Sequence, residues 1–84
     1  MSGILKMFVQ QGCATCTEQK KVLKKVTTAV TIEVIDCGEQ EAVADLYKVR
    51  STPSFVGVKD GTVVFKKAGY FDEKRLKGLL ARLE

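Results

Sequence analysis

Apolar positions along the chain fall into short continuous runs and helically spaced stripes. Residues 4–9 (ILKMFV) form a short, nearly continuous apolar run, which is typical of a strand buried on both faces. Residues 31–36 (TIEVID) are rich in β-branched side chains and predict a second strand. Between them, apolar residues at a 3.6-residue period predict a helix from Ala14 to about Ala29. Strand, helix and strand at this spacing predict a parallel pair with a right-handed crossover.

The middle of the chain predicts another helix and then a hairpin. The helix spans residues 39–48, with acidic residues in its first turn, where the helix dipole favours them. Its apolar face is expected to contain Ala42, Val43, Leu46 and Tyr47. Two β-rich runs, residues 54–58 and 62–67, then flank Lys59-Asp60-Gly61. An Asp-Gly pair between such runs is a strong signal for an antiparallel hairpin.

A final helix is predicted by its N-cap and by its leucine stripe. Asp72 is a candidate N-cap, and four leucines follow at the i, i+3, i+4, i+7 spacing of one buried face: Leu76, Leu79, Leu80 and Leu83. The element order is therefore βαβαββα. It predicts an α/β fold in which three helices flank a four-stranded mixed sheet, within one domain that covers residues 1–84.

The composition is that of one compact domain. The chain has 84 residues, of which 45% are hydrophobic. A domain of this size buries about 60–65% of the surface of its unfolded chain and can fold without a metal or a disulfide. No stretch approaches the ~20 apolar residues of a membrane helix. Three cysteines are an odd number, which argues against a secreted disulfide framework. We therefore expect a cytoplasmic monomer without a membrane contact.

The net charge of +4 raises the question of a nucleic-acid partner. Basic residues are densest in the first predicted helix, at Lys20, Lys21, Lys24 and Lys25. They alternate with Val22, Leu23 and Val26 at helical spacing, which predicts the solvated face of an amphipathic helix. No aromatic residues are interleaved with them to stack on bases. We therefore expect no nucleic-acid partner.

Two cysteines three residues apart follow the first apolar run. If Cys13 is the N-cap of the predicted helix, its sulfur can accept a hydrogen bond from the Cys16 backbone N–H, one of the unsatisfied donors of a helix start. The helix dipole also favours a thiolate there, so the pKa of Cys13 falls below that of a free cysteine. Cys16 lies one turn further in and stays protonated until needed. This asymmetry predicts two-step disulfide exchange, in which Cys13 attacks and Cys16 resolves.

Two other interpretations of the cysteines remain open. A zinc ion needs four ligands, and without histidine it would require all three cysteines and a carboxylate such as Asp36. An inert pair of core cysteines is the second, although two glutamines and a glycine just before the pair indicate an exposed turn. We interpret the third cysteine, Cys37, as a small, partly buried residue at the end of a strand. The neighbouring carboxylates of Asp36 and Glu39 are expected to raise its pKa.

Two segments, GCATC (residues 12–16) and VRSTPSF (residues 49–55), carry a resemblance to a known family. The first resembles the Cys-x-x-Cys motif of the thioredoxin/glutaredoxin superfamily, and the second resembles the segment around that family's cis-proline. The resemblance extends from Ile4 to Leu83. It implies a thioredoxin-like fold and a dithiol–disulfide oxidoreductase that reduces protein disulfides and needs no cofactor, with Cys13 and Cys16 as the catalytic residues.

The same resemblance implies where substrates dock. In the family, the proline lies beside the reactive thiol, and the backbone of the preceding residue pairs with the incoming substrate. Carried over to this chain, Pro53 is the cis-proline and Thr52 is the residue whose backbone docks the substrate. Gly69 corresponds to a glycine that lines the docking groove, and Gly12, next to the first cysteine, is assigned to the same surface.

The resemblance also bears on the reductant. The carboxy-terminal half resembles thioredoxins, which implies recharging by a thioredoxin-reductase-type enzyme. A glutathione-dependent, glutaredoxin-like protein is the alternative, with Asp72 and Arg50 available for the charged groups of glutathione. Gln10 and Gln11 stand where many glutaredoxins have a lysine, so we expect the reductase to act faster. Met7 stands where thioredoxins bury an aspartate.

Overall fold

The computed structural model describes residues 2–84. Its elements follow the order expected from the sequence, βαβαββα. Along the chain they are β1 (Ile4–Val9), α1 (Ala14–Lys24), β2 (Thr31–Asp36), α2 (Glu41–Leu46), β3 (Ser54–Lys59), β4 (Thr62–Ala68) and α3 (Glu73–Ala81). The predicted fold class is confirmed.

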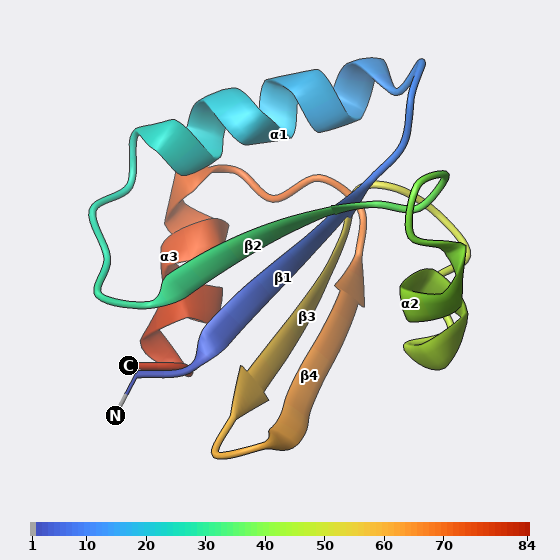
Figure 1. Cartoon of the computed structure of the whole chain (residues 1–84). Helices are drawn as coiled ribbons and strands as arrows, with labels where there is room; N and C mark the ends of the chain where they lie inside the picture. Colours follow the sequence, from blue (N-terminus) through green and yellow to red (C-terminus); the bar gives the residue numbers. More distant parts are fainter. Residues whose placement is uncertain (1) are drawn as a thin grey trace.

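The four strands form one mixed sheet in the order β2-β1-β3-β4. β1 and β2 are parallel, as predicted from the intervening helix, and their register runs from Ile4 opposite Thr31 to Val9 opposite Asp36. β3 is antiparallel to both β1 and β4. Because β1 and β2 end at the same edge of the sheet, the turn that carries the cysteine pair and the turn that carries Cys37 both begin at that edge (Figure 1).

Alternating side chains of β1 supply two cores, one on each face of the sheet. Leu5 and Met7 pack with the residues of α1 and α3, including the leucine stripe, and the stripe is buried as predicted. Phe8 packs on the other face against Ala44 of α2. Two helices therefore cover one face, and α2 covers part of the other (Figure 1).

Helix α1 ends at Lys24, about five residues before the predicted end. The N–H groups of Lys25 and Val26 bond to carbonyls three residues back, at 3.0 and 3.3 Å, which tightens and closes the last turn. β-branched residues fill positions 26–28, and such side chains lose rotamer freedom in a helix. The chain instead turns towards β2, where the Thr28 hydroxyl accepts the Val30 N–H at 3.1 Å.

Helix α2 is shorter than predicted, and its buried face is different. Asp36 Oδ1 accepts the N–H groups of Gly38 and Glu39, so the residues before the helix form a turn. Ala44 is the buried residue of α2, whereas Leu46, which was assigned to the apolar face, is 73% exposed. Ala42 of the predicted face is also exposed, and Val43 and Tyr47 are half-buried. A helix of six residues has too few apolar positions for periodicity alone to fix which side meets the sheet.

The local signals for the hairpin and the last helix are confirmed. Asp60 and Gly61 both have positive φ, 54° and 76°, as a two-residue type I′ turn requires. The flanking strands each extend one residue further than predicted, to Lys59 and Ala68. Asp72 caps α3, since its carboxylate accepts a hydrogen bond from a backbone N–H of the first turn.

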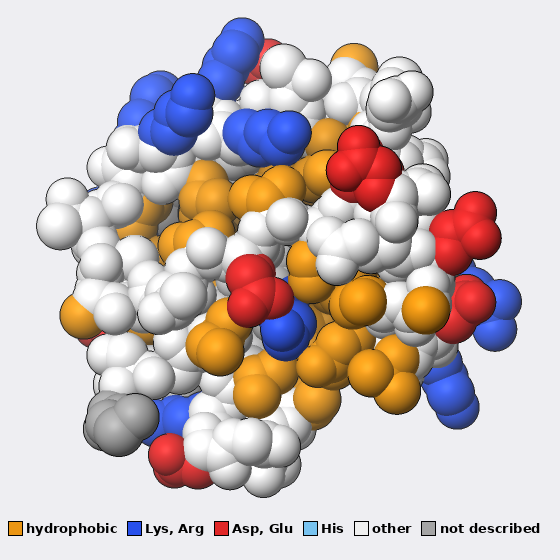
Figure 2. Space-filling view, in the orientation of Figure 1, with side chains coloured by type: hydrophobic (Ala, Val, Ile, Leu, Met, Phe, Trp, Pro, Cys, Tyr) orange, Lys and Arg blue, Asp and Glu red, His pale blue; other side chains and the backbone are white. Residues whose placement is uncertain are grey.

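The lysines of α1 lie on its solvent side. All four residues of the predicted basic cluster are exposed, and Lys21 pairs with Glu18 at 3.0 Å, so the solvated-face interpretation agrees with the structure. Figure 2 shows Lys and Arg side chains along the upper edge of this face, with hydrophobic side chains below them. Leu23 of α1 and Ile32 and Val34 of β2 line a shallow apolar hollow. Within residues 2–84, no helix has the length and apolar character needed to cross a membrane.

Candidate active site

The cysteine pair lies at the start of α1, as its sequence position predicts. Cys13 is the N-cap residue, with extended backbone angles (φ −97°, ψ 96°), and its sulfur accepts the backbone N–H of Cys16 at 3.1 Å. The two residues form a disulfide, and their Cα atoms are 5.2 Å apart. The predicted capping geometry is therefore confirmed, and the first turn of α1 contains no acidic residue to oppose a thiolate.

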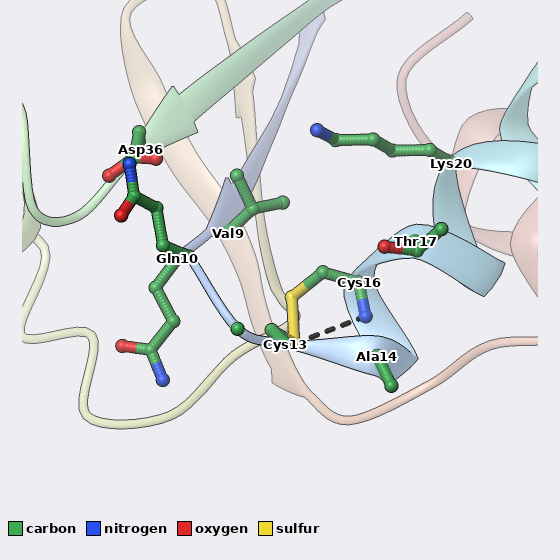
Figure 3. A pocket seen from close by; sticks show the side chains of 10 residues that line it. Val9, Gln10, Cys13, Ala14, Cys16, Thr17, Lys20 and Asp36 are labelled. Atoms are coloured by element: carbon green, nitrogen blue, oxygen red, sulfur yellow. Dashed lines mark hydrogen bonds between the residues drawn. A yellow bond between two sulfur atoms is a disulfide. The ribbon is translucent and has the colours of Figure 1, made fainter.

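The two sulfurs differ in access to solvent. Cys13 is half-buried, whereas Cys16 is 3% exposed and packs with Met7 and Val9 in the core shared by α1 and α3. The disulfide borders a cavity of about 450 Å³ at the end of β1. Figure 3 shows the disulfide among the side chains that line this cavity. The cavity is lined by Val9, Gln10, Gln11, Gly12, Cys13, Ala14, Cys16, Thr17, Lys20 and Asp36.

A second group of residues lies against the Cys13 sulfur from the side of β3. The Thr52 carbonyl oxygen is 3.8 Å from Cys13 Sγ, and the Thr52-Pro53 peptide bond is cis, as the resemblance implied. The Gly69 N–H donates to the Pro53 carbonyl at 2.9 Å, with Gly69 at φ +101°. We call Thr52, Pro53 and Gly69 the docking edge. Gly12 (φ +74°) belongs instead to the cavity on the other side of Cys13.

The cavity beside the pair is lined by one charged residue of each sign, Lys20 and Asp36. Lys20 extends from α1 over the cavity, and Asp36 enters it from the end of β2 (Figure 3). Asp36 Oδ1 accepts two backbone N–H groups at 2.8 and 3.2 Å, which hold the carboxylate at the strand end. Met7 is fully buried in the core, so the position that is an aspartate in thioredoxins supplies no charge here. Cys16 is therefore surrounded by apolar side chains and not by a buried carboxylate.

Cys37 lies at the same edge of the sheet as the pair but on the opposite face. Its N–H donates to the Val9 carbonyl at 2.8 Å, and its side chain packs against the core under α2. Burial raises the pKa of the Cys37 thiol, and the charge of Asp36 raises it further. The predicted direction of the pKa shift is confirmed, but burial is the larger cause, and of the two predicted charges only Asp36 contributes. Across residues 2–84, no three Cys, His, Asp or Glu side chains cluster as metal ligands.

Two features of the site were not predicted from the sequence. Gln19 in α1 is fully buried, and its side-chain amide forms two hydrogen bonds with the backbone of Phe71. The only available signal was a polar residue inside the apolar stripe of the helix, three positions after Cys16. The Thr52 hydroxyl oxygen is also buried, and it has no hydrogen-bond partner among the described residues.

Comparisons with known proteins agree with this fold. The Thioredoxin family model matches residues 3–82. Thioredoxin-1 of Drosophila melanogaster is 30% identical over 80 residues, which cover 90% of this chain and 74% of that protein. Among solved structures, a single-site mutant of a thioredoxin from Halobacterium salinarum superposes with a TM-score of 0.91 at 30% identity, covering 98% of this chain and 74% of that one. The thioredoxin of Fasciola hepatica gives 0.88 at 26% identity, covering 99% and 82%.

The fold and the cysteine pair at a helix start thus define a thioredoxin-like redox protein. The match to the family model extends over nearly the whole chain, and the curated relatives support thiol–disulfide chemistry in general. The chain belongs to the thioredoxin family.

Proposed function

We propose that this chain reduces disulfide bonds in protein substrates, with Cys13 as the nucleophile and Cys16 as the resolving thiol. The difference in exposure between the two sulfurs carries the proposal. The attacking sulfur has to be reached by a substrate, whereas the resolving sulfur has to reach only its partner. Cys13 at the N-cap meets the first requirement, and Cys16, buried one helical turn away, meets the second.

The reaction consists of two exchanges between sulfurs. The Cys13 thiolate attacks one sulfur of the substrate disulfide; that bond breaks, and the departing substrate thiolate takes a proton from water. Cys16 then gives its proton to water, and its thiolate attacks the Cys13 sulfur in the mixed disulfide; the bond between Cys13 and the substrate breaks, and the second substrate thiolate takes a proton from water. Two electrons have passed to the substrate, and the Cys13–Cys16 disulfide of the structure is the product state. Neither exchange requires a cofactor.

The docking edge is the surface on which a substrate would lie. Thr52 brings a backbone carbonyl to the Cys13 sulfur, and Pro53 and Gly69 are joined by a hydrogen bond beside it. Gly12 lacks a side chain next to Cys13 and leaves that approach open, since a Cβ built there would meet no atom within 4 Å. A substrate strand could therefore come close to the sulfur from either side.

Single cysteine variants test the roles. Cys13→Ser is expected to abolish reduction of a protein disulfide such as insulin, because no thiolate remains at the helix start. Cys16→Ser keeps the attacking thiol and is expected to accumulate a mixed disulfide with the substrate, which mass spectrometry detects. Cys37→Ala serves as the matched control and is expected to keep wild-type turnover. Faster alkylation of Cys16 than of Cys13 in the reduced wild-type protein at neutral pH would reverse the two roles.

The reductant is proposed to be a thioredoxin-reductase-type enzyme. Lys20 is the cation that lines the cavity, and Gln10 and Gln11 add no second one for the other carboxylate of glutathione. The carboxylate of Asp72 is engaged as the N-cap of α3. Each charge-assisted hydrogen bond contributes about 1.5–3 kcal/mol, so one fewer contact weakens glutathione binding roughly ten- to a hundredfold. Recharging rates with a thioredoxin reductase and with millimolar glutathione, measured side by side, test this. Faster recharging by glutathione would assign a glutaredoxin-like role.

A further inference from the structure

Gln19 joins the helix of the cysteine pair to the segment that follows β4. The side chain is fully buried, and its amide bonds to a single residue 52 positions away. The Nε2 group donates to the Phe71 carbonyl at 2.8 Å, and Oε1 accepts the Phe71 N–H at 2.7 Å. A carboxamide carries one donor group and one acceptor oxygen, so this one side chain satisfies both backbone groups of Phe71.

Phe71 lies in a three-residue loop, residues 69–71, between β4 and the N-cap of α3. The loop is held at its first residue by the bond from Gly69 N–H to the Pro53 carbonyl. At its last residue, the Phe71 ring packs edge-on against Phe55, at 5.7 Å between centroids. The Arg75 guanidinium lies 4.3 Å from the centroid of the same ring. The aromatic packing holds the ring, and Gln19 holds the backbone.

These bonds connect the two parts that a protein substrate has to contact at once. α1 carries the cysteine pair at its first turn, and the 69–71 loop carries Gly69 of the docking edge. Figure 1 shows the connection from β4 to α3 running below α1. Within residues 2–84, the two bonds of Gln19 are the only hydrogen bonds between α1 and this loop. The hydrogen-bonded link between the helix of the cysteine pair and the loop of Gly69 therefore runs through Gln19.

We propose that Gln19 is a positioning residue that fixes the 69–71 loop against α1 and so sets the docking edge for protein disulfides. The proposal rests on the proposed function. A protein substrate needs the sulfur and the docking edge in register, whereas a small disulfide needs the sulfur alone. Loss of the two hydrogen bonds is therefore expected to affect the two kinds of substrate differently.

The test compares Gln19→Leu with the wild-type protein on insulin, with dithiothreitol as reductant, and on a small aromatic disulfide, with the pre-reduced protein as the only, stoichiometric reductant. Leucine has a similar volume but leaves the Phe71 N–H and carbonyl unpaired. The KM for insulin is expected to rise about tenfold with kcat within about twofold, while the rate with the small disulfide stays within about twofold. Leu83→Ala is the matched control: Leu83 is fully buried at the other end of the sheet, where its carbonyl accepts the Gly3 N–H at 2.6 Å.

A second variant, Gln19→Glu, gives a readout that a purely structural role would not produce. A protonated carboxyl group can make both bonds to Phe71, whereas a carboxylate can only accept. The insulin KM of this variant, relative to wild type at each pH, is therefore expected to fall as the pH is lowered from about 8 to about 5. In the wild-type protein, the Phe71 amide is expected to exchange with deuterium as slowly as core amides do.

The outcomes separate the two proposals. A wild-type protein that reduces neither disulfide would overturn the proposed function itself. An active wild type whose Gln19→Leu variant keeps its insulin KM, loses both activities in parallel, or changes no more than Leu83→Ala would overturn only the positioning role. If Gln19→Leu does not fold, rapid exchange of the Phe71 amide in the wild-type protein would overturn it equally.

Discussion

Gly69 and Gly61 offer a matched pair of substitutions that separates docking from stability. Both have positive φ, +101° and +76°, and a Cβ built on either would meet no atom within 4 Å. The cost of alanine at either position is therefore conformational rather than steric, about 1–2 kcal/mol for an L-residue forced into this region. For a domain of this size, that cost lowers Tm by roughly 4–15 °C. Gly69→Ala is expected to be at least as destabilising as Gly61→Ala, because its φ lies further from the left-handed helical region.

The two variants are expected to differ in function. A Cβ at Gly69 would project into open space beside Pro53, and under the proposed function a substrate backbone enters that space. Gly61 is in the β3–β4 turn, at the far end of β3 from Pro53. We expect Gly69→Ala to raise the KM for insulin about five- to tenfold, roughly 1–1.4 kcal/mol, while Gly61→Ala leaves it unchanged.

Thermal unfolding monitored by circular dichroism and steady-state reduction of insulin provide the two measurements. An unchanged insulin KM in Gly69→Ala would refute the assignment of this glycine to the docking surface. An equal rise in the insulin KM of both variants would show that the change in KM comes from lost stability and not from docking. In either case the loss of Tm in Gly61→Ala remains an independent check on the conformational cost.

Three further predictions concern single side chains. Thr52→Val removes the buried hydroxyl, which has no hydrogen-bond partner among the described residues. The free energy of unfolding, measured in urea, is expected to stay unchanged or to rise by up to about 1 kcal/mol. A clear decrease would mean that the hydroxyl has a partner. Asp72→Ala removes the acceptor of the Arg75 N–H at 2.9 Å and is expected to cost about 1 kcal/mol, which Asp72→Ser should largely restore. Burial and the charge of Asp36 raise the pKa of Cys37. Alkylation of Cys37 by iodoacetamide should therefore increase only above the pH at which ordinary thiols react. Peptide mapping that finds Cys37 modified at neutral pH would contradict this.

Local signals in the sequence were sufficient for most of the fold and for the position of the cysteine pair. The Asp-Gly turn requires positive φ at two successive residues, and few other residue pairs tolerate that conformation. The cap at Asp72 and the leucine stripe that follows are read from residues within three turns of one helix. Cys13 and Cys16 are likewise placed by a strand that ends and a helix that begins next to them. Each of these signals depends on residues that are close together along the chain, so each can be recognised in the sequence alone.

Tertiary structure decided the features that depend on distant partners. The end of α1 follows from the path that the chain takes to β2, and the buried side of α2 follows from its contact with the sheet at Ala44. The burial of Gln19 depends on a backbone that lies 52 residues further along the chain. A buried amide is tolerated only when its donor and acceptor are both satisfied, and the peptide group of Phe71 comes within reach only once α1, β4 and α3 have packed together.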